Sequence, residues 1–199
     1  MISPREIATG LYGAYRLARL DTGGMAWFDR TLSGFWKSFF AAVLAAPLYI
    51  LLTALHLFDD TGRELLEMAG GMRVFLIETL AYVIGWVLFP LVMIRVTDLL
   101  QREQEYFGFI IAYNWAGVLQ IAAFLCAVVL SVSGLFPAAV GDFLSMIVFF
   151  AILYYQWFIT RTALRIRAGA AVAIVCLDMA LSIFITGIAN AMLYMSPGT

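Results

Sequence analysis

Five long apolar runs constrain the fold of this chain more than any other feature of its sequence. They cover residues 34–57, 74–96, 107–132, 138–160 and 168–194. At a rise of about 1.5 Å per residue, a helix of each run is long enough to cross a hydrocarbon core of about 30 Å. The composition agrees, since only 13% of the residues are charged, against about 25% in soluble domains. We therefore predict an all-α integral membrane protein with five transmembrane helices.

A cytoplasmic amphipathic helix is predicted ahead of the first span. Ser3 and Glu6 have the spacing of a capping box, and Ile7 begins an apolar face that repeats with the helical period. We accordingly divide the chain into an N-terminal amphipathic or interfacial segment, residues 1–33, and a five-helix bundle, residues 34–195. Two placements of the segment remain open, since such a helix either packs under a bundle or lies in the lipid interface.

The distribution of basic residues predicts the orientation of the chain. With five spans, the side that holds the N-terminus carries Arg5, Arg16, Arg19, Arg30, Lys37, Arg95, Arg102, Arg161, Arg165 and Arg167. The other side carries only Arg63 and Arg73. Because basic residues concentrate on the cytoplasmic side, we expect a bacterial inner (plasma) membrane protein with a cytoplasmic N-terminus and an outside C-terminus. Arg161, Arg165 and Arg167 then form an interfacial basic turn between the last two spans.

A polar stripe is predicted inside the fifth span. Asp178 lies near the middle of this run, where an acid costs about 2.5–3.5 kcal/mol by insertion scales. Ser182, Thr186 and Asn190 follow it at four-residue steps. Side chains at this spacing stay close to one face of a helix, so the stripe runs from roughly the midplane to the outer surface.

Counting depth along the spans gives Asp178 its expected neighbours. Asn114 of the third span lies near the same level, and Gln120 lies about one turn further out. No Lys or Arg lies deep enough to pair with the acid, so we expect Asp178 to be neutral at pH 7 and hydrogen-bonded, with Asn114 as first candidate partner. Glu78 lies about one turn into the second span, where water or Arg73 can reach it.

These polar residues admit two functional interpretations. Polar side chains in membrane bundles commonly hydrogen-bond neighbouring helices, at about 0.6 kcal/mol each, which predicts a scaffold or binding protein that joins a membrane-protein partner or a second copy of itself. The alternative is a channel or transporter subunit with a polar half-path for a proton, cation or small polar solute, with Asp178 at its inner end. A solvated cavity that reaches Asp178 would favour the second interpretation.

Other classes of function have no support in the sequence. There is no P-loop, HExxH or GxSxG motif, and one histidine with two separated cysteines gives no metal-ligand spacing. We therefore predict no enzyme, metal site or cofactor. The net charge of −1 argues against a nucleic-acid partner, which leaves the lipid bilayer as the expected surroundings.

Three segments resemble the Yip (Ypt-interacting-protein) family. They are Phe35-Trp36-Lys37-Ser38-Phe39-Phe40 before the first span, residues 107–120 with Tyr113 and Trp115, and residues 157–173 at the turn between the fourth and fifth spans. The resemblance is to the prokaryotic type and implies a five-helix membrane protein with a cytoplasmic N-terminal region. The Asp-Leu-Tyr-Gly-Pro motif of eukaryotic members is absent, so the resemblance supports the five-helix architecture and gives no support to a role in small-GTPase binding.

Overall fold

The computed structural model describes residues 2–57 and 60–194, and within these residues it contains helices and no strands. The elements are α1 (Pro4–Ala18), η1 (Thr22–Trp27), α2 (Leu32–Ser38), α3 (Phe40–Leu57), α4 (Asp60–Ala69), α5 (Gly71–Leu99), η2 (Glu103–Glu105), α6 (Tyr106–Val132), α7 (Ala138–Leu164) and α8 (Ala168–Tyr194). Among them, five helical stretches are long and apolar enough to cross a membrane: α2 with α3, α5, η2 with α6, α7, and α8. The all-helical class and the five candidate spans are thus confirmed.

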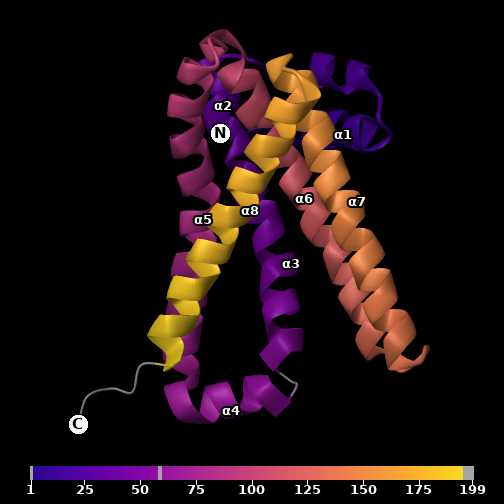
Figure 1. The fold of residues 1–199 in the computed structure, drawn as a ribbon, viewed down its shortest axis with the longest axis vertical. Helices are drawn as coiled ribbons and strands as arrows, with labels where there is room; N and C mark the ends of the chain where they lie inside the picture. The colour runs from indigo at the N-terminus through magenta and orange to yellow at the C-terminus, as the bar shows by residue number, and fades with distance from the viewer. Residues whose placement is uncertain (1, 58–59, 195–199) are drawn as a thin grey trace.

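The five long stretches form two pairs with α3 between them. Helices α5 and α8 lie side by side, as do α6 and α7, and α3 packs on α6 (Figure 1). The pairs approach each other where α7 leads into α8 and diverge towards the opposite end. Helix α4 lies across the ends of α3, α5 and α8 there. We call the two ends of the molecule the α1 end and the α4 end after the short helices that mark them.

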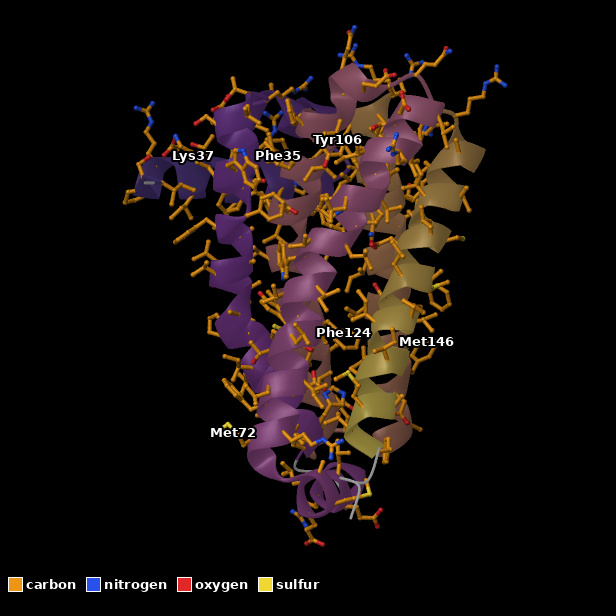
Figure 2. All side chains as sticks on the ribbon, turned by 90° about the vertical axis from the view of Figure 1, so that its left-hand side faces the viewer. Phe35, Lys37, Met72, Tyr106, Phe124 and Met146 are labelled. Carbon is orange, nitrogen blue, oxygen red and sulfur yellow. The ribbon has the colours of Figure 1, made fainter. Side chains whose placement is uncertain are left out.

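The outer surface changes character along the long axis. Figure 2 shows nitrogen- and oxygen-tipped side chains gathered at the two ends, while the middle, around Phe124 and Met146, is almost all carbon. Large apolar side chains point outwards along this middle zone, and Phe184 and Ile183 are 61% and 64% exposed. An apolar belt between polar ends is the surface that suits a hydrocarbon layer.

The first predicted span is not one continuous helix, contrary to our expectation for residues 34–57. Helix α2 ends at Ser38, and α3 begins at Phe40. The Ser38 hydroxyl donates to the Phe35 carbonyl at 2.7 Å, and the Phe39 amide donates to Trp36 at 3.3 Å, in a tightened turn. Local side-chain bonding of this kind competes with the regular helical ladder, which explains the break.

Helix α1 packs against the bundle at the α1 end. Gly10 allows this approach, because a Cβ added there would lie 2.4 Å from Cε2 of Trp115 on α6. On α7, the Tyr155 hydroxyl donates to the Ala14 carbonyl at 2.7 Å. Of the two placements left open by the sequence, the structure therefore has α1 seated on α6 and α7.

The predicted capping box is present and ties α1 to α2. The Ser3 amide donates to the Glu6 carboxylate at 2.7 Å, and the Glu6 amide donates to Ser3 Oγ at 3.3 Å. Glu6 also forms an ion pair with Lys37 at 2.6 Å. The Lys37 ammonium, together with the hydrogen bonds from Ser3, lowers the pKa of Glu6 to about 2. This carboxylate is thus charged at neutral pH and links the two helices.

Candidate functional site

Asp178 on α8 lies where three helices meet. The Tyr113 hydroxyl on α6 donates to one carboxylate oxygen at 2.9 Å, and the side-chain amide of Gln156 on α7 donates to the other. The Tyr113 ring stacks on Phe89 of α5 with 4.5 Å between centroids, which fixes the direction of its hydroxyl. The acid is therefore held by hydrogen bonds from α6 and α7.

The expected hydrogen bond between Asp178 and Asn114 is not formed, and that prediction was wrong. Asn114 is fully buried, and its amide nitrogen donates to Ser38 Oγ on α2 at 2.9 Å. Depth was judged correctly, but consecutive helical residues point about 100° apart. Tyr113 faces α8 whereas Asn114 faces α2.

Sequence reasoning missed Gln156 altogether, although a usable signal was present. Gln156 lies eight residues before the end of α7 at Leu164, and Asp178 lies ten residues after the start of α8 at Ala168. At about 1.5 Å per residue both lie at similar depths, about 12 and 15 Å from the same end of the molecule. The depth count that selected Asn114 would have selected this amide as well.

A cavity of about 410 Å³, the Asp178 cavity, opens beside the acid and is walled by all five candidate spans. Its lining residues are Tyr49 and Leu52 of α3; Ala81, Tyr82, Gly85 and Trp86 of α5; Tyr113, Gly117, Gln120 and Ile121 of α6; Gln156 of α7; and Asp178, Ser182, Ile185 and Thr186 of α8. One carboxyl group, two amides, several hydroxyls and four aromatic rings thus face one space. No lysine or arginine is among these residues.

The predicted stripe on α8 enters this cavity over most of its length. Ser182 and Thr186 line it together with Asp178, and Gln120 faces it from α6. Asn190 is not among the lining residues. Twelve residues of α-helix turn the side-chain direction by about 120°, which takes Asn190 off the face that Asp178 shares with the cavity.

Glu78 belongs to a second cavity nearer the α4 end. It accepts a hydrogen bond from the Tyr49 hydroxyl at 2.8 Å. Arg73, the partner considered from the sequence, donates to the Met192 carbonyl at 2.6 Å. This Glu78 cavity measures about 320 Å³, lies between α3, α4 and α5, and has mainly apolar walls.

Two tyrosines line both cavities and separate the two acids. The rings of Tyr49 and Tyr82 lie 4.6 Å apart between centroids. The Tyr82 hydroxyl donates to the Ala42 carbonyl at 2.6 Å, so this ring is anchored on α3. Tyr49 is instead anchored on Glu78. The position of the Tyr49 ring, which forms part of the wall between the two cavities, therefore depends on its hydrogen bond to Glu78.

The basic turn between α7 and α8 is a structural junction at the α1 end. Arg165 takes a left-handed conformation with φ of 53° and ends α7. Its guanidinium lies 3.4 Å from Glu105, and the Arg161 guanidinium lies 5.4 Å from the centroid of the Trp157 ring. Arg167 follows directly before α8. None of the three arginines lines either acid-bearing cavity.

Comparison with known proteins assigns no family to this arrangement. No family model matches the chain, and neither a curated protein nor a solved structure matches it.

Proposed function

We propose that the chain is a multi-pass membrane protein that binds a small cation in the Asp178 cavity, as a channel or transporter subunit would. The observation that carries this proposal is the cavity itself, because residues of all five candidate spans line one open space that contains an acid, two amides and several hydroxyl groups. A scaffold with a dry core needs no such space. The volume of about 410 Å³ falls within the range of about 300–1,000 Å³ that is usual for small-molecule sites.

The chemistry of the walls favours a cationic ligand. Asp178 is the one Asp, Glu, Lys, Arg or His residue among those that line the cavity, so an anion would meet an acid and no basic group. Tyr and Trp rings attract cations through their π faces, and four of them line this cavity. A bare metal ion would leave most of the volume unfilled. We therefore propose a small organic ammonium ion as the ligand that fits best.

Binding of such a cation is coupled to release of a proton in this proposal. A partly buried acid with no basic side chain beside it stays protonated until a cation supplies the opposite charge. An incoming ammonium ion would take the place of the acidic proton of Asp178, and the proton would leave to solvent. The Tyr113 hydroxyl and the Gln156 amide hold the carboxylate in place during the exchange.

The two ends of the cavity differ in access. Towards the α1 end its lining residue Tyr113 packs against the buried rings of Phe89 and Phe109. Towards the α4 end the stripe residues Ser182 and Thr186 are exposed, and the Glu78 cavity lies beyond Tyr49. The arrangement supports a half-path that is open on one side, with Glu78 as an outer acid on the way to Asp178.

Calorimetric titration of the purified protein with methylammonium and tetramethylammonium tests the proposal. We expect saturable binding with release of about one proton, read from titrations in buffers of different ionisation enthalpy. Asp178→Asn should weaken binding about 10- to 100-fold, the usual effect of losing a charged partner. Asp142→Asn, which alters an exposed acid on α7 outside the cavity, is the matched control. Unchanged binding in Asp178→Asn would refute the site.

The proposed role of Glu78 as an outer acid can be tested separately from that of Asp178, in lipid vesicles. If it lies on the route and not at the final site, Glu78→Gln should slow the association of methylammonium with the protein in proteoliposomes and leave the equilibrium Kd unchanged. A loss of equilibrium binding equal to that of Asp178→Asn would place the ligand between the two acids and contradict the order proposed.

A scaffold that binds another membrane protein or a second copy of itself is the second candidate. The observation that favours it is a strip of exposed aromatic residues on α7, formed by Phe143, Phe150 and Tyr154. These positions recur at seven and eleven residues and so share one helix face. Chemical crosslinking in native membranes tests it, because a scaffold should yield a defined larger species that is lost when these three residues become alanine.

We also propose the orientation of the chain in the membrane, together with the Yip-like architecture of five spans after a cytoplasmic N-terminal region. Ten of the twelve basic residues were assigned from the sequence to the side of the N-terminus, and α1 and the basic turn lie together at the α1 end (Figure 1). We propose that this end is cytoplasmic in a bacterial inner membrane. A periplasm-active reporter fused after Thr199 should then be active, whereas one fused at Gln101 should be inactive.

A further inference from the structure

A third cavity, the α1 pocket, lies at the α1 end and is independent of the Asp178 cavity. It measures about 170 Å³ and is bounded by α1, the segment after η1, α2 and α6. Ser38 and Trp115, both at most 4% exposed, line its buried side. Four charged side chains also line it, namely Arg5, Glu6, Asp29 and Lys37.

The backbone around the α1 pocket is constrained by close contacts. A Cβ at Gly34 would lie 1.8 Å from the Asp29 carbonyl oxygen, so this glycine lets the chain before α2 fold back on itself. The Asp29 carboxylate accepts a bond from the Thr31 amide at 3.2 Å, which orients it. The backbone beside the pocket is therefore fixed by packing at Gly34, while the exposed side chains of Arg5 and Asp29 stand at its rim.

The charges in the α1 pocket balance. Glu6 and Lys37 form a direct ion pair at 2.6 Å across the pocket, from α1 to α2. Arg5 and Asp29 add one further charge of each sign. An anion alone would approach two carboxylates, and a cation alone would approach two basic groups. A ligand that carries both charges meets a partner for each of them.

The level of the pocket indicates where such a ligand would come from. Trp27 lines it, and Trp36, on the helix that also carries Lys37, is 66% exposed. Exposed tryptophans beside basic residues are typical of the headgroup level of a bilayer. In Figure 2, Lys37 lies at the end of the molecule where nitrogen-tipped side chains gather, just beyond the carbon belt.

We propose that the α1 pocket binds the headgroup of a phosphoethanolamine lipid, with the phosphate at Arg5 and Lys37 and the primary ammonium at Asp29 and Glu6. A primary ammonium offers three N–H donors to the two carboxylates. A choline headgroup has none, and a glycerol headgroup lacks the positive charge. The proposal does not rest on cation binding at Asp178, because the two cavities share no lining residue.

Native mass spectrometry of the detergent-solubilised protein tests this site. Phosphatidylethanolamine, phosphatidylglycerol and phosphatidylcholine with identical acyl chains are added in equal amounts, and retained lipid is measured. We expect preferential retention of phosphatidylethanolamine. Arg5→Gln and Asp29→Asn should each lower that retention about tenfold, as expected for losing one charge-assisted hydrogen bond. Arg19→Gln directly after α1 and Asp98→Asn at the end of α5 remove the same charges outside the pocket and should not change lipid retention.

Three outcomes would overturn the proposal. Equal or stronger retention of phosphatidylglycerol would mean a general attraction to basic residues, and equal retention of phosphatidylcholine would mean no recognition of the ammonium. Unchanged retention in Arg5→Gln with an intact melting temperature would place the lipid elsewhere. Soluble glycerophosphoethanolamine provides the last arm, since binding as tight as that of the lipid would identify a free solute as the ligand.

Discussion

The α1 end and the α4 end of this protein are built from the same long helices but packed in opposite ways. At the α1 end, large side chains such as Leu17, Met93 and Phe109 are fully buried. Beside α4, the smaller buried cluster consists of Val74, Ile77, Ala189 and Leu193. The two larger cavities, those of Asp178 and Glu78, lie between the packed core and the α4 end, and the α1 end holds only the smaller α1 pocket among the cavities described above. Tight packing thus fixes the bundle at the α1 end, whereas the looser packing towards the α4 end leaves room for the larger cavities.

The largest expected effect comes from removing one aromatic ring from the packed core and comparing it with the removal of an exposed ring. Phe109 is fully buried, whereas Phe184 on α8 is 61% exposed. Phe109→Ala should lower the free energy of unfolding by about 3–5 kcal/mol, the usual cost of such a core cavity. Phe184→Ala should cost much less, because its ring already contacts the surroundings. Unfolding titrations in mixed micelles measure both, and equal losses would contradict the proposed difference.

Adding a methyl group, instead of removing a ring, also tests the difference in packing between the two regions. At Gly10 the new Cβ would lie 2.4 Å from the Trp115 ring, while at Gly187 on α8 no atom lies within 4 Å. Gly10→Ala should destabilise the protein by about 1–3 kcal/mol through overpacking. Gly187→Ala should be neutral or stabilising by up to about 1 kcal/mol, since alanine favours a helix interior. Melting temperatures of the two variants give the comparison directly.

Asp178 lies at the junction of the packed and the open regions, and two substitutions separate its roles. In Asp178→Asn, Oδ1 can still accept from Tyr113, and the Gln156 amide can turn to accept from the new amide group, so stability should be nearly unchanged. Asp178→Leu leaves both donors without an acceptor and should cost about 1–3 kcal/mol. If Asp178→Asn lowers the melting temperature as much as Asp178→Leu does, the hypothesis that Asp178 is a neutral, hydrogen-bonded acid is wrong.

The smallest expected effect is a pH dependence confined to the α1 end. The pKa of Glu6 is lowered from its ordinary 4.5 to about 2 by Lys37 and Ser3. A depressed pKa means that the carboxylate stabilises the folded state fully above pH 4.5, and that this contribution is lost as pH falls towards 2. Protection factors of α1 amides should fall between pH 5 and pH 3. In Glu6→Gln this fall should be smaller, with the remainder due to Asp21, whose pKa is also lowered by its hydrogen bond from Arg16 of α1. Amides of α8 serve as the internal control.

The lengths of the helices were predictable from the sequence. The prediction of 168–194 for the last span matches α8, and 107–132 differs from α6 by one residue at its start. Helix α5 begins at Gly71, three residues earlier than predicted, because the helix continues past the apolar run into Met72 and Arg73. Run length measures how much chain a hydrocarbon layer would cover, and helices continue into the polar zones on either side.

The rotation of each helix about its own axis was not predictable in the same way. Helix α6 is apolar on almost every side, so its sequence has no polar face from which a direction could be inferred. Depth alone could not distinguish Tyr113 from its neighbour Asn114. The partner of Asp178 was therefore missed, although the acid and most of its stripe were found. Which helices pair with which is likewise set by packing that a run of leucine, valine and phenylalanine does not encode locally.

The position of Asp178 on α8 has a consequence for how the protein is made. Membrane helices leave the ribosome in chain order, and α8 follows the other four long stretches. Residues of α1, α6 and α7 that form the packed core are all present before α8 is synthesised. Until α8 is made, the Tyr113 hydroxyl and the Gln156 amide have no carboxylate to contact, and α5 lacks α8, the helix that packs along it. The hydrogen bonds that hold Asp178 can therefore form only after α8 has been synthesised, so the proposed cation site is the last part of the bundle to be completed.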